Sequence, residues 1–386
     1  MSLSVAELYH RAAAVVDLAC ISHNLHVVRE KAPGRKIIAM IKANAYGHGL
    51  TRIGAHLAAE GVDYLGTAFV EEALELRKAG ITTPIITSGP FSKFQIGLFI
   101  ENQIDFTVGS VDALQLIIES AAFYKKRVNL HLKIDTGMMR IGIRHSNADK
   151  LFLAALQAEK LVNVVSVFSH FANADSDDLS FARLQLERFA EAVRFYERHN
   201  APKPLLQIAN SAAILRLPDS QLDMVRPGIM LYGCHPSPHT AAEAQLRPAL
   251  SLRAKVMYFK VILKGSTVGY SRTWTAPENC RAVTLPVGYA DGYSRGLSNK
   301  GQVLLRGRKY PVVGTICMDQ LVVNIGGGEA YNGDEAVLIG KQGDEIITAD
   351  DLAAQLGTIS YEVLTSISQR VPRIYINERL DERIWP

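Results

Sequence analysis

Several residues with chemically active side chains stand at or just after the ends of short apolar runs. The run in "AMIKANAYGHG" (39–49) stops at Lys42 and a glycine-rich turn. A lysine held away from water can lose its proton and form a Schiff base with a carbonyl group. The other residues placed in this way are Asp135, Arg140, Ser169, His170, Asn210, Ser211 and Arg226. Together they predict one site in which a lysine does covalent chemistry beside cationic groups.

Two of the segments that follow these runs could bind a phosphate. "SAAIL" (211–215) begins a helix and "RPGI" (226–229) contains a glycine, so both offer backbone N–H groups to an anion. In barrel proteins, the loops after the last strands often bind phosphate. A Schiff-base lysine near a phosphate site favours pyridoxal phosphate over a substrate carbonyl as its partner.

Each residue also has a structural interpretation. Lys42 could be a solvated strand end, and His170 could be a hydrogen-bonded core histidine. Ser211 could cap a helix, and Arg226 could form an ion pair with Asp223. Their shared position at strand ends favours the functional interpretation for the set as a whole.

The apolar runs of the first 235 residues or so alternate with longer amphipathic stretches. One such stretch, 69–80, has helical spacing and ends at Gly80. The runs are 36–42, 62–68, 84–89, 104–110, 128–135, 162–170, 205–210 and 222–233. Eight strand and helix repeats predict a (β/α)8 TIM-type barrel, whose catalytic groups come from the C-terminal strand ends. An open doubly wound sheet is the alternative, because periodicity does not show closure.

The pattern changes near Pro248. Short Val-rich runs then follow each other closely and are separated by Gly, Lys and Asp, which predicts a mostly antiparallel β domain. Thr348 followed by an acidic first turn, with Gly357 at the end, predicts a helix within this part. The predicted domains are 1–245, a cofactor-binding barrel, and 246–386, a β-rich domain.

Composition limits the class of protein. A length of 386 residues with 48% hydrophobic content suggests two domains. The 42 Lys and Arg against 38 Asp and Glu leave +4 without basic blocks, so nucleic-acid and membrane partners are not expected. Cys20, Cys234, Cys280 and Cys317 lack metal or disulfide spacing, so no metal site is expected. With no leader and no apolar run near about 18 residues, we expect a cytoplasmic protein.

Eight motifs resemble those of the alanine racemase family, pyridoxal-phosphate enzymes that join a barrel to a β-rich domain. They are "KANAYGHG", "KIDTGMMRIG", "FSHFANAD", "IANSAA", "VRPGIMLYG", "VGYADGYSR", "GTICMDQ" and "ISYEVLTSISQRVPR". They follow one another in the family's order along almost the whole chain. The resemblance implies interconversion of L-alanine and D-alanine, a supply of D-alanine for peptidoglycan, and a homodimer.

The resemblance also implies catalytic roles. Lys42 would hold the cofactor as a Schiff base and act as one of two acid–base groups. Tyr270 would be the second, supplied by the neighbouring subunit, since racemisation removes a proton on one face and returns it on the other. His170 would orient that tyrosine. Arg226 would bond the pyridine nitrogen and keep it unprotonated, which makes the cofactor a weaker electron sink.

The resemblance implies binding residues as well. The residues that would hold the cofactor, mainly through its phosphate, are Tyr46, Asn210, Ser211, Gly228, Ile229 and Tyr361. Arg140 and the backbone N–H of Met318 would recognise the substrate carboxylate, next to Tyr270. The residues that would line the entrance are Asp175, Tyr289, Arg295 and Ile359.

Three positions carry over less directly. Lys133 matches a lysine that some family members carry as a carbamate, and an ordinary lysine that pairs with Asp135 or an anion is equally acceptable. Thr315 stands where some relatives have an arginine, so access to the site could differ. His48 inherits no role and is interpreted as a turn residue.

Three alternative functions stay open. A racemase for serine or for several amino acids would need only a slightly different pocket near Tyr361. A decarboxylase of the same fold group should favour an acidic contact to the pyridine nitrogen, where this chain offers Arg226. A non-catalytic cofactor carrier would lack the β-rich domain.

Overall fold

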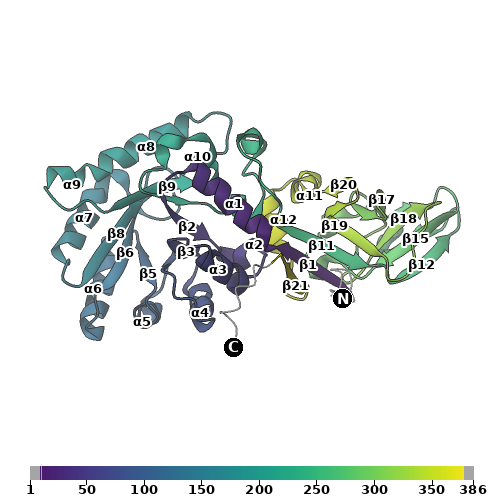
Figure 1. The fold of residues 1–386 in the computed structure, drawn as a ribbon, viewed down its shortest axis with the longest axis horizontal. Coiled ribbons are helices and arrows are strands. Elements are labelled where there is room, and N and C mark those ends of the chain that lie inside the picture. The colour runs from purple at the N-terminus through teal and green to yellow at the C-terminus, as the bar shows by residue number, and fades with distance from the viewer. Residues whose placement is uncertain (1–8, 10, 378–386) are drawn as a thin grey trace. The chain divides into compact units, whose positions relative to one another are not determined.

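The computed structural model describes residues 9 and 11–377 (Figure 1). The chain forms two compact units. The barrel unit comprises Ser22–Ala45 and Leu50–Arg247. The β unit contains the described residues up to Ile21, the short segment Tyr46–Gly49, and the described residues from Pro248 on. The domains expected from the sequence, 1–245 and 246–386, differ from these units mainly at the N-terminal segment, which belongs to the β unit.

The barrel unit is built around eight parallel strands. They are β2 (Lys36–Met40), β3 (Tyr64–Thr67), β4 (Ile85–Thr87), β5 (Asp105–Val108), β6 (Val128–Asp135), β8 (Val162–Phe168), β9 (Leu205–Asn210) and β10 (Met224–Arg226). Strand β10 pairs with β2, and β5 pairs with β6, so the sheet closes on itself. This closure confirms the predicted barrel and excludes the open sheet. Strand β7 (Ile143–Arg144) is a short addition beside β6.

Helices follow the strands and surround them in Figure 1. They are α1 (Leu18–Lys31), α3 (Leu50–Ala59), α4 (Val70–Lys78), α5 (Ile96–Glu101), α6 (Val111–Tyr124), α7 (Ala148–Gln157), α8 (Ser180–Val193), α9 (Phe195–Arg198) and α10 (Ser211–Arg216). Helix α4 lies within the stretch predicted from its spacing. It buries Val70, Ala73 and Leu76 on one face, and Gly80 after its end has a φ of +78°. A side chain at that φ would be strained, which explains the glycine.

The β unit contains a ten-stranded sheet. Its strands are β1 (Ala12–Asp17), β11 (Leu250–Lys255), β12 (Tyr258–Ile262), β15 (Cys280–Leu285), β16 (Gln302–Leu305), β17 (Arg308–Val313), β18 (Leu321–Gly326), β19 (Glu335–Gln342), β20 (Glu345–Ile347) and β21 (Arg373–Ile376). Among the described strands, the pairs are antiparallel except β1 with β21. The mostly antiparallel sheet confirms the predicted fold class.

Two helices, α11 (Ala349–Leu356) and α12 (Ser360–Ser366), interrupt the strands. Helix α11 begins as predicted. The Thr348 hydroxyl accepts a hydrogen bond from the Asp351 N–H at 3.0 Å. Gly357 ends the helix with a φ of +70°. Helix α12 places Tyr361 in its first turn.

Strand β1 was not among the predicted strands. It lies between β11 and β21 and is almost completely buried. The buried Asp291 carboxylate ties the same segment to the unit, since it accepts from Arg11 Nη2 at 2.8 Å and lies 3.0 Å from Arg370 Nε. Its other oxygen accepts from the Gly288 N–H at 2.9 Å. One carboxylate therefore joins three segments that are far apart in the sequence.

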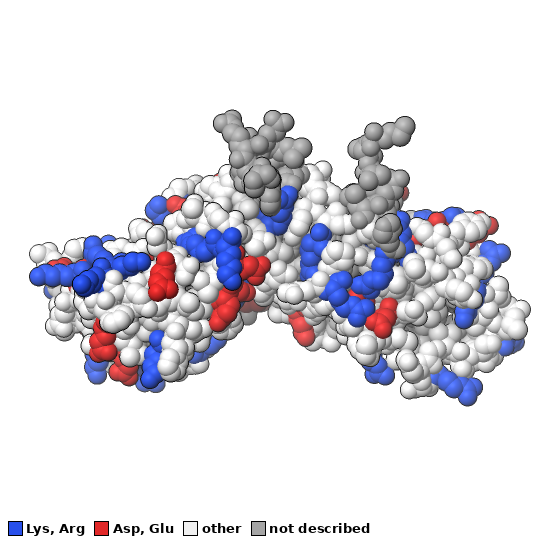
Figure 2. All heavy atoms as spheres, turned by 90° about the horizontal axis from the view of Figure 1, so that it is seen from below, with Lys and Arg blue, Asp and Glu red and all other residues white. Residues whose placement is uncertain are grey.

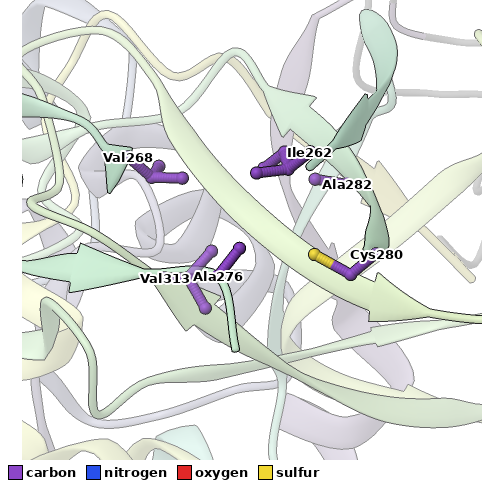
Figure 3. Close-up of a cluster of buried hydrophobic side chains, with 6 residues drawn as sticks. All are labelled: Ile262, Val268, Ala276, Cys280, Ala282 and Val313. Carbon is purple, nitrogen blue, oxygen red and sulfur yellow. The ribbon is translucent and has the colours of Figure 1, made fainter. Parts of the chain in front are cut away.

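A small core supports the hairpin β13 (Thr267–Val268) and β14 (Trp274–Thr275). Figure 3 shows its side chains, which are Ile262, Val268, Ala276, Cys280, Ala282 and Val313. Val268 is anchored in this core two residues before Tyr270. The exposed loop that carries Tyr270 is thus attached to the sheet by buried apolar contacts.

Charges of both signs are mixed on the surface. On the face drawn in Figure 2, Lys and Arg side chains lie near Asp and Glu side chains, with uncharged residues between them. Within the part of the chain that the structure describes, every helix is too short or too polar to cross a bilayer.

Candidate functional site

Lys42 is followed by a turn of left-handed backbone. The four residues Ala43–Tyr46 have φ values of 54°, 55°, 52° and 52°. Each L-residue in this conformation costs about 1–2 kcal/mol. Such strain persists only where the surroundings hold the backbone firmly. The turn therefore marks Lys42 as a residue whose position is closely defined.

Hydrogen bonds within the barrel unit hold the start of this turn. The Ala43 N–H donates to Glu72 Oε1 at 2.6 Å, and Glu72 Oε2 accepts from the Ala68 N–H at 2.8 Å. The Asn44 Oδ1 accepts from the Leu50 N–H at 2.8 Å. Glu72 thus fastens the backbone directly after Lys42 to the loop that precedes helix α4.

The environment of Lys42 lowers the pKa of its amine. Burial lowers the pKa of Lys42, and the positive charges of Arg140 and Arg226 lower it further, whereas Glu72 raises it. A larger fraction of neutral amine is what nucleophilic attack on a carbonyl requires. The geometry and the charges agree with a Schiff-base lysine.

Arg226 is buried at the end of β10, and both of its Nη atoms donate hydrogen bonds. Its Nη2 donates to the carbonyl oxygens of Ser169 at 2.6 Å and Ile208 at 3.1 Å. Its Nη1 donates to Gln207 Oε1 at 2.8 Å. Burial lowers its pKa to about 9, so the guanidinium stays charged at neutral pH. Asp223 accepts from the Leu206 N–H instead, so the ion pair with Arg226 considered from the sequence is not formed.

His170 faces Arg226. Its Nδ1 lies 3.3 Å from Arg226 Nη2. Because a guanidinium only donates, Nδ1 must accept, and the ring proton of the neutral histidine is on Nε2. Burial lowers the pKa of His170 far below its usual range, and the positive charges of Lys133 and Arg226 add to this effect. His170 is therefore a neutral hydrogen-bond donor through Nε2.

The expected phosphate site has available donors. Asn210 caps helix α10, since its Oδ1 accepts from the Ala213 N–H at 3.0 Å, so the interpretation of Ser211 as the cap is wrong. The buried Ser211 hydroxyl accepts from the Gly228 N–H at 2.8 Å and keeps its own proton to donate. Ile229 begins the 3-10 helix η5 (Ile229–Tyr232), where first-turn N–H groups lack intrahelical partners. These donors fit a phosphate group.

In the β unit, Tyr46 packs beside Tyr361. Their ring centroids are 6.1 Å apart at an interplanar angle of 50°. Tyr46 is buried, and this burial raises its pKa. The Tyr46 phenol is therefore a neutral donor, as a phosphate contact requires.

The segment Thr315–Met318 connects the other predicted residues of the β unit. The Thr315 hydroxyl donates to the Tyr270 carbonyl at 2.9 Å. The Tyr289 N–H donates to the Cys317 carbonyl at 3.1 Å. Thr315 is buried, so it supports the Tyr270 loop instead of lining an open surface. The Tyr270 side chain itself is 70% exposed.

The predicted entrance residues lie on short elements. Tyr289 begins η8 (Tyr289–Asp291), Arg295 begins η9 (Arg295–Leu297), and Ile359 is the cap residue of α12. All three are exposed. Asp175 lies in the barrel unit, where its carbonyl accepts from the Ser237 hydroxyl.

The structure thus gathers the predicted residues in two groups. The barrel unit holds Lys42, Lys133, Arg140, His170, Asp175, Asn210, Ser211, Arg226, Gly228 and Ile229. The β unit holds Tyr46, Tyr270, Tyr289, Arg295, Met318, Ile359 and Tyr361. His48 is buried next to the Tyr46 carbonyl, which its Nδ1 contacts at 2.9 Å.

Sequence reasoning missed two supporting residues, Glu72 and Gln207. Glu72 stands three residues after Phe69, the position from which an acidic side chain reaches back to the start of a helix. Gln207 is a polar residue inside an apolar strand, which signals a buried hydrogen-bond partner.

Lys133 is buried, and no carboxylate among the described residues lies at ion-pair distance from it. Its Nζ lies 4.5 Å from the centre of the Phe168 ring. Burial, followed by the charges of Arg226 and Arg140, lowers its pKa well below the ordinary 10.5, although Asp135 opposes the shift. Protonated Lys133 is therefore unfavourable in the folded cofactor-free protein.

We expect Lys133→Met to stabilise the cofactor-free protein in CO2-free buffer by about 1–3 kcal/mol at neutral pH. The unfolded state binds the lysine proton more tightly, so the wild-type penalty is complete at low pH and declines as the pH rises toward 10.5. Urea unfolding at several pH values should show the difference between the proteins shrinking accordingly.

The interpretation of Lys133 as a carbamate is tested by measuring the stability of both proteins again in the presence of bicarbonate. Bicarbonate should stabilise the wild-type protein and leave Lys133→Met unchanged if CO2 converts the amine into an anion beside Arg140 and Arg226. A variant that is less stable than wild type at every pH without bicarbonate would contradict the unfavourable cation.

Two family models together match most of the chain. The family model described as alanine racemase, N-terminal domain, matches residues 16–236, and the one described as alanine racemase, C-terminal domain, matches residues 249–375. The curated alanine racemase of Cutibacterium acnes is 44% identical over 368 residues, which cover 95% of this chain and 98% of that protein.

Solved structures agree with these matches. The alanine racemase of D-cycloserine-producing Streptomyces lavendulae superimposes with a TM-score of 0.90 at 37% identity, over 96% of this chain and 98% of that one. The histidine racemase of Leuconostoc mesenteroides reaches a TM-score of 0.88 at 29% identity, over 95% and 98% of the two chains.

Proposed function

The chain belongs to the alanine racemase family, and we propose on this premise that it interconverts L-alanine and D-alanine with pyridoxal phosphate. The observation that supports the proposal most directly is the position of Lys42. Its backbone is fastened by Glu72, and burial and the charges of two arginines lower the pKa of its amine. The donors of Ser211 and Ile229 fit the phosphate of the cofactor.

When bound, pyridoxal phosphate withdraws electrons from the Cα atom and so acidifies the Cα–H bond. Lys42 Nζ would hold the cofactor and then exchange a proton with Cα on one face. The Tyr270 hydroxyl would exchange a proton on the opposite face. His170 would keep the tyrosine oriented through Nε2–H, and Arg226 would donate to the ring nitrogen without releasing its proton. Arg140 and the Met318 N–H would bind the carboxylate.

Formation of D-enantiomers from a panel of L-amino acids tests this function. The purified, cofactor-loaded protein should convert L-alanine, and Lys42→Ala provides the blank. The panel includes serine and histidine, because the same fold is found in a histidine racemase. Conversion of several amino acids would favour a broader racemase, and bound cofactor without conversion would favour a decarboxylase or a carrier.

We also propose that two chains share their active sites. Tyr270 is the expected second base, and it stands 70% exposed on the β unit, which suits a residue that completes the site of a neighbouring chain. The hairpin beneath it is anchored by Val268 in the core of Figure 3.

Mixing two inactive variants tests this arrangement. Lys42→Ala and Tyr270→Ala should each be inactive, but hybrid dimers contain one site with both wild-type residues. We expect the mixture to recover up to about one quarter of the wild-type activity per dimer, from random pairing of chains. Activity assays after subunit exchange, with exchange verified by mass-tagged chains, provide the measurement. Complete exchange without recovery would place both bases in one chain.

The cellular role follows from the family. We infer that the D-alanine product supplies peptidoglycan synthesis in the cytoplasm.

A further inference from the structure

A line of buried polar side chains runs through the barrel from Asp105 to Arg226. His131 Nε2 lies 3.2 Å from Asp105 Oδ2, and His131 Nδ1 lies 2.7 Å from Ser166 Oγ. Gln207 Nε2 donates to Ser166 Oγ at 2.7 Å, and Gln207 Oε1 accepts from Arg226 Nη1 at 2.8 Å. We call these five residues the core relay.

The core relay joins the two ends of the barrel. Asp105 is the first residue of β5, and Arg226 is the last residue of β10. Because the strands are parallel, these residues stand at opposite ends. His131, Ser166 and Gln207 are completely inaccessible to solvent, so none of them can exchange its partner for water.

The hydrogen-bonding capacity of Arg226 sets the direction in which the residues of the relay donate. A guanidinium has donors only, so Gln207 must present its oxygen to Arg226. The Gln207 amide nitrogen then donates to Ser166, and His131 Nδ1 is the acceptor at hydrogen-bond distance for the proton of this buried hydroxyl. His131 therefore carries its proton on Nε2 and donates it to Asp105.

The other end of the relay requires the same direction. An ionised Asp105 carboxylate only accepts, and its Oδ1 already accepts from Asn129 Nδ2 at 3.1 Å. The acceptor facing His131 selects the Nε2–H tautomer, and that tautomer makes His131 Nδ1 an acceptor for Ser166. Both ends of the relay therefore favour the same direction of donation.

We propose that Asp105, through His131 and Ser166, stabilises the orientation of the Gln207 amide that presents its oxygen to Arg226, and that Gln207 thereby positions Arg226. Asp105, His131, Ser166 and Gln207 are positioning residues. The consequence for catalysis rests on the proposed function, in which Arg226 contacts the cofactor ring. The direction of the relay itself does not.

Asp105→Asn is the informative substitution, because it keeps the shape and changes the direction. The new amide oxygen is needed by Asn129, so the new NH2 group faces His131 Nε2. His131 must then accept at Nε2 and donate from Nδ1. If the Gln207 amide followed this reversal, its NH2 group would face Arg226 and two donors would meet. If it did not, the buried Ser166 hydroxyl would lose the acceptor for its proton. Either way the relay loses one hydrogen bond, which weakens the hold of Gln207 on Arg226.

The first readout uses cofactor-free protein labelled with 15N-histidine. We expect the wild-type His131 ring, identified by loss of its signals in His131→Asn, to carry its proton on Nε2. Asp105→Asn should move that proton to Nδ1. Ser166→Ala should leave it on Nε2, because Asp105 is still present.

The second readout uses cofactor-loaded protein. Both Asp105→Asn and Ser166→Ala should shift the visible absorbance of the cofactor and lower kcat by about tenfold or more, with a smaller change in KM. Thr87→Val is the matched control, since it removes a buried hydrogen bond to Thr67 of 3.1 Å inside the same barrel without touching the relay.

The results separate the two proposals. A wild-type His131 proton on Nδ1, or relay variants that match Thr87→Val in absorbance and kcat, would overturn the relay. A wild-type protein that binds the cofactor but does not racemise alanine would overturn the proposed function, and the relay is then decided by the 15N signals and the absorbance.

Discussion

Lys42→Ala is expected to abolish the visible absorbance of the bound cofactor and to lower racemisation by at least about 10⁴-fold. The substitution removes both the amine that forms the Schiff base and one of the two groups that move the Cα proton. The neighbouring turn is held by Glu72 and Asn44, which the substitution leaves in place. The fold should therefore survive.

The measurement combines absorbance titration with pyridoxal phosphate and a D-alanine assay. Lys36→Ala is the control, because this lysine begins the same strand and pairs with Asp63 on the surface at 3.0 Å. It should bind the cofactor and turn over as wild type does. A small primary amine added to Lys42→Ala should restore part of the activity. Undiminished turnover without it would remove Lys42 from the mechanism.

Tyr270→Phe is expected to retain the cofactor and to lose about 10²–10⁴-fold in racemisation. Only the hydroxyl is removed, and the exposed ring makes no contribution to the buried core beneath the hairpin. Because Lys42 still serves one face of the substrate, one enantiomer of alanine should continue to exchange its Cα hydrogen with solvent while the other should not.

Deuterium incorporation from D2O, followed by NMR for each enantiomer separately, measures this asymmetry. Tyr258→Phe, another exposed tyrosine of the β unit, is the control and should behave as wild type. Loss of cofactor from Tyr270→Phe would show that Tyr270 has a structural role instead, and equal exchange of both enantiomers would show that another group serves the second face.

The barrel could be predicted from the sequence because its strands are short runs rich in Val, Ile and Leu that alternate with amphipathic stretches. The run 36–40 is apolar after its first residue and is buried on both faces from Ile37 on, so composition marks it. Strand β1 was not predicted because its partners, β11 and β21, lie more than two hundred residues away along the chain, and no local sequence pattern encodes that pairing. The placement of the N-terminal segment in the β unit has the same cause.

The polar residues divide in a similar way. Lys42, His170 and Arg226 were identified because they end strands, and strand ends are visible in sequence. The hydrogen-bond partner of Arg226 could not be identified in this way. Whether Gln207 or Asp223 reaches Arg226 depends on the strand face that each side chain occupies and on the register between β9 and β10, which is irregular. Asn210 displaced Ser211 as the helix cap for a related reason, a shift of one residue at a boundary.

The left-handed turn after Lys42 has one more consequence, and it concerns chirality. A backbone with φ near +54° is strained for an L-residue. It is the mirror image of the right-handed helical region, so a D-residue prefers it. Ala43 and Ala45 are L-alanines held in a backbone conformation that D-alanine adopts without strain. In a chain assembled by chemical ligation, D-alanine at these two positions would relax the segment. The proposed product of the enzyme is thus a better building block for this turn than the residue the ribosome supplies.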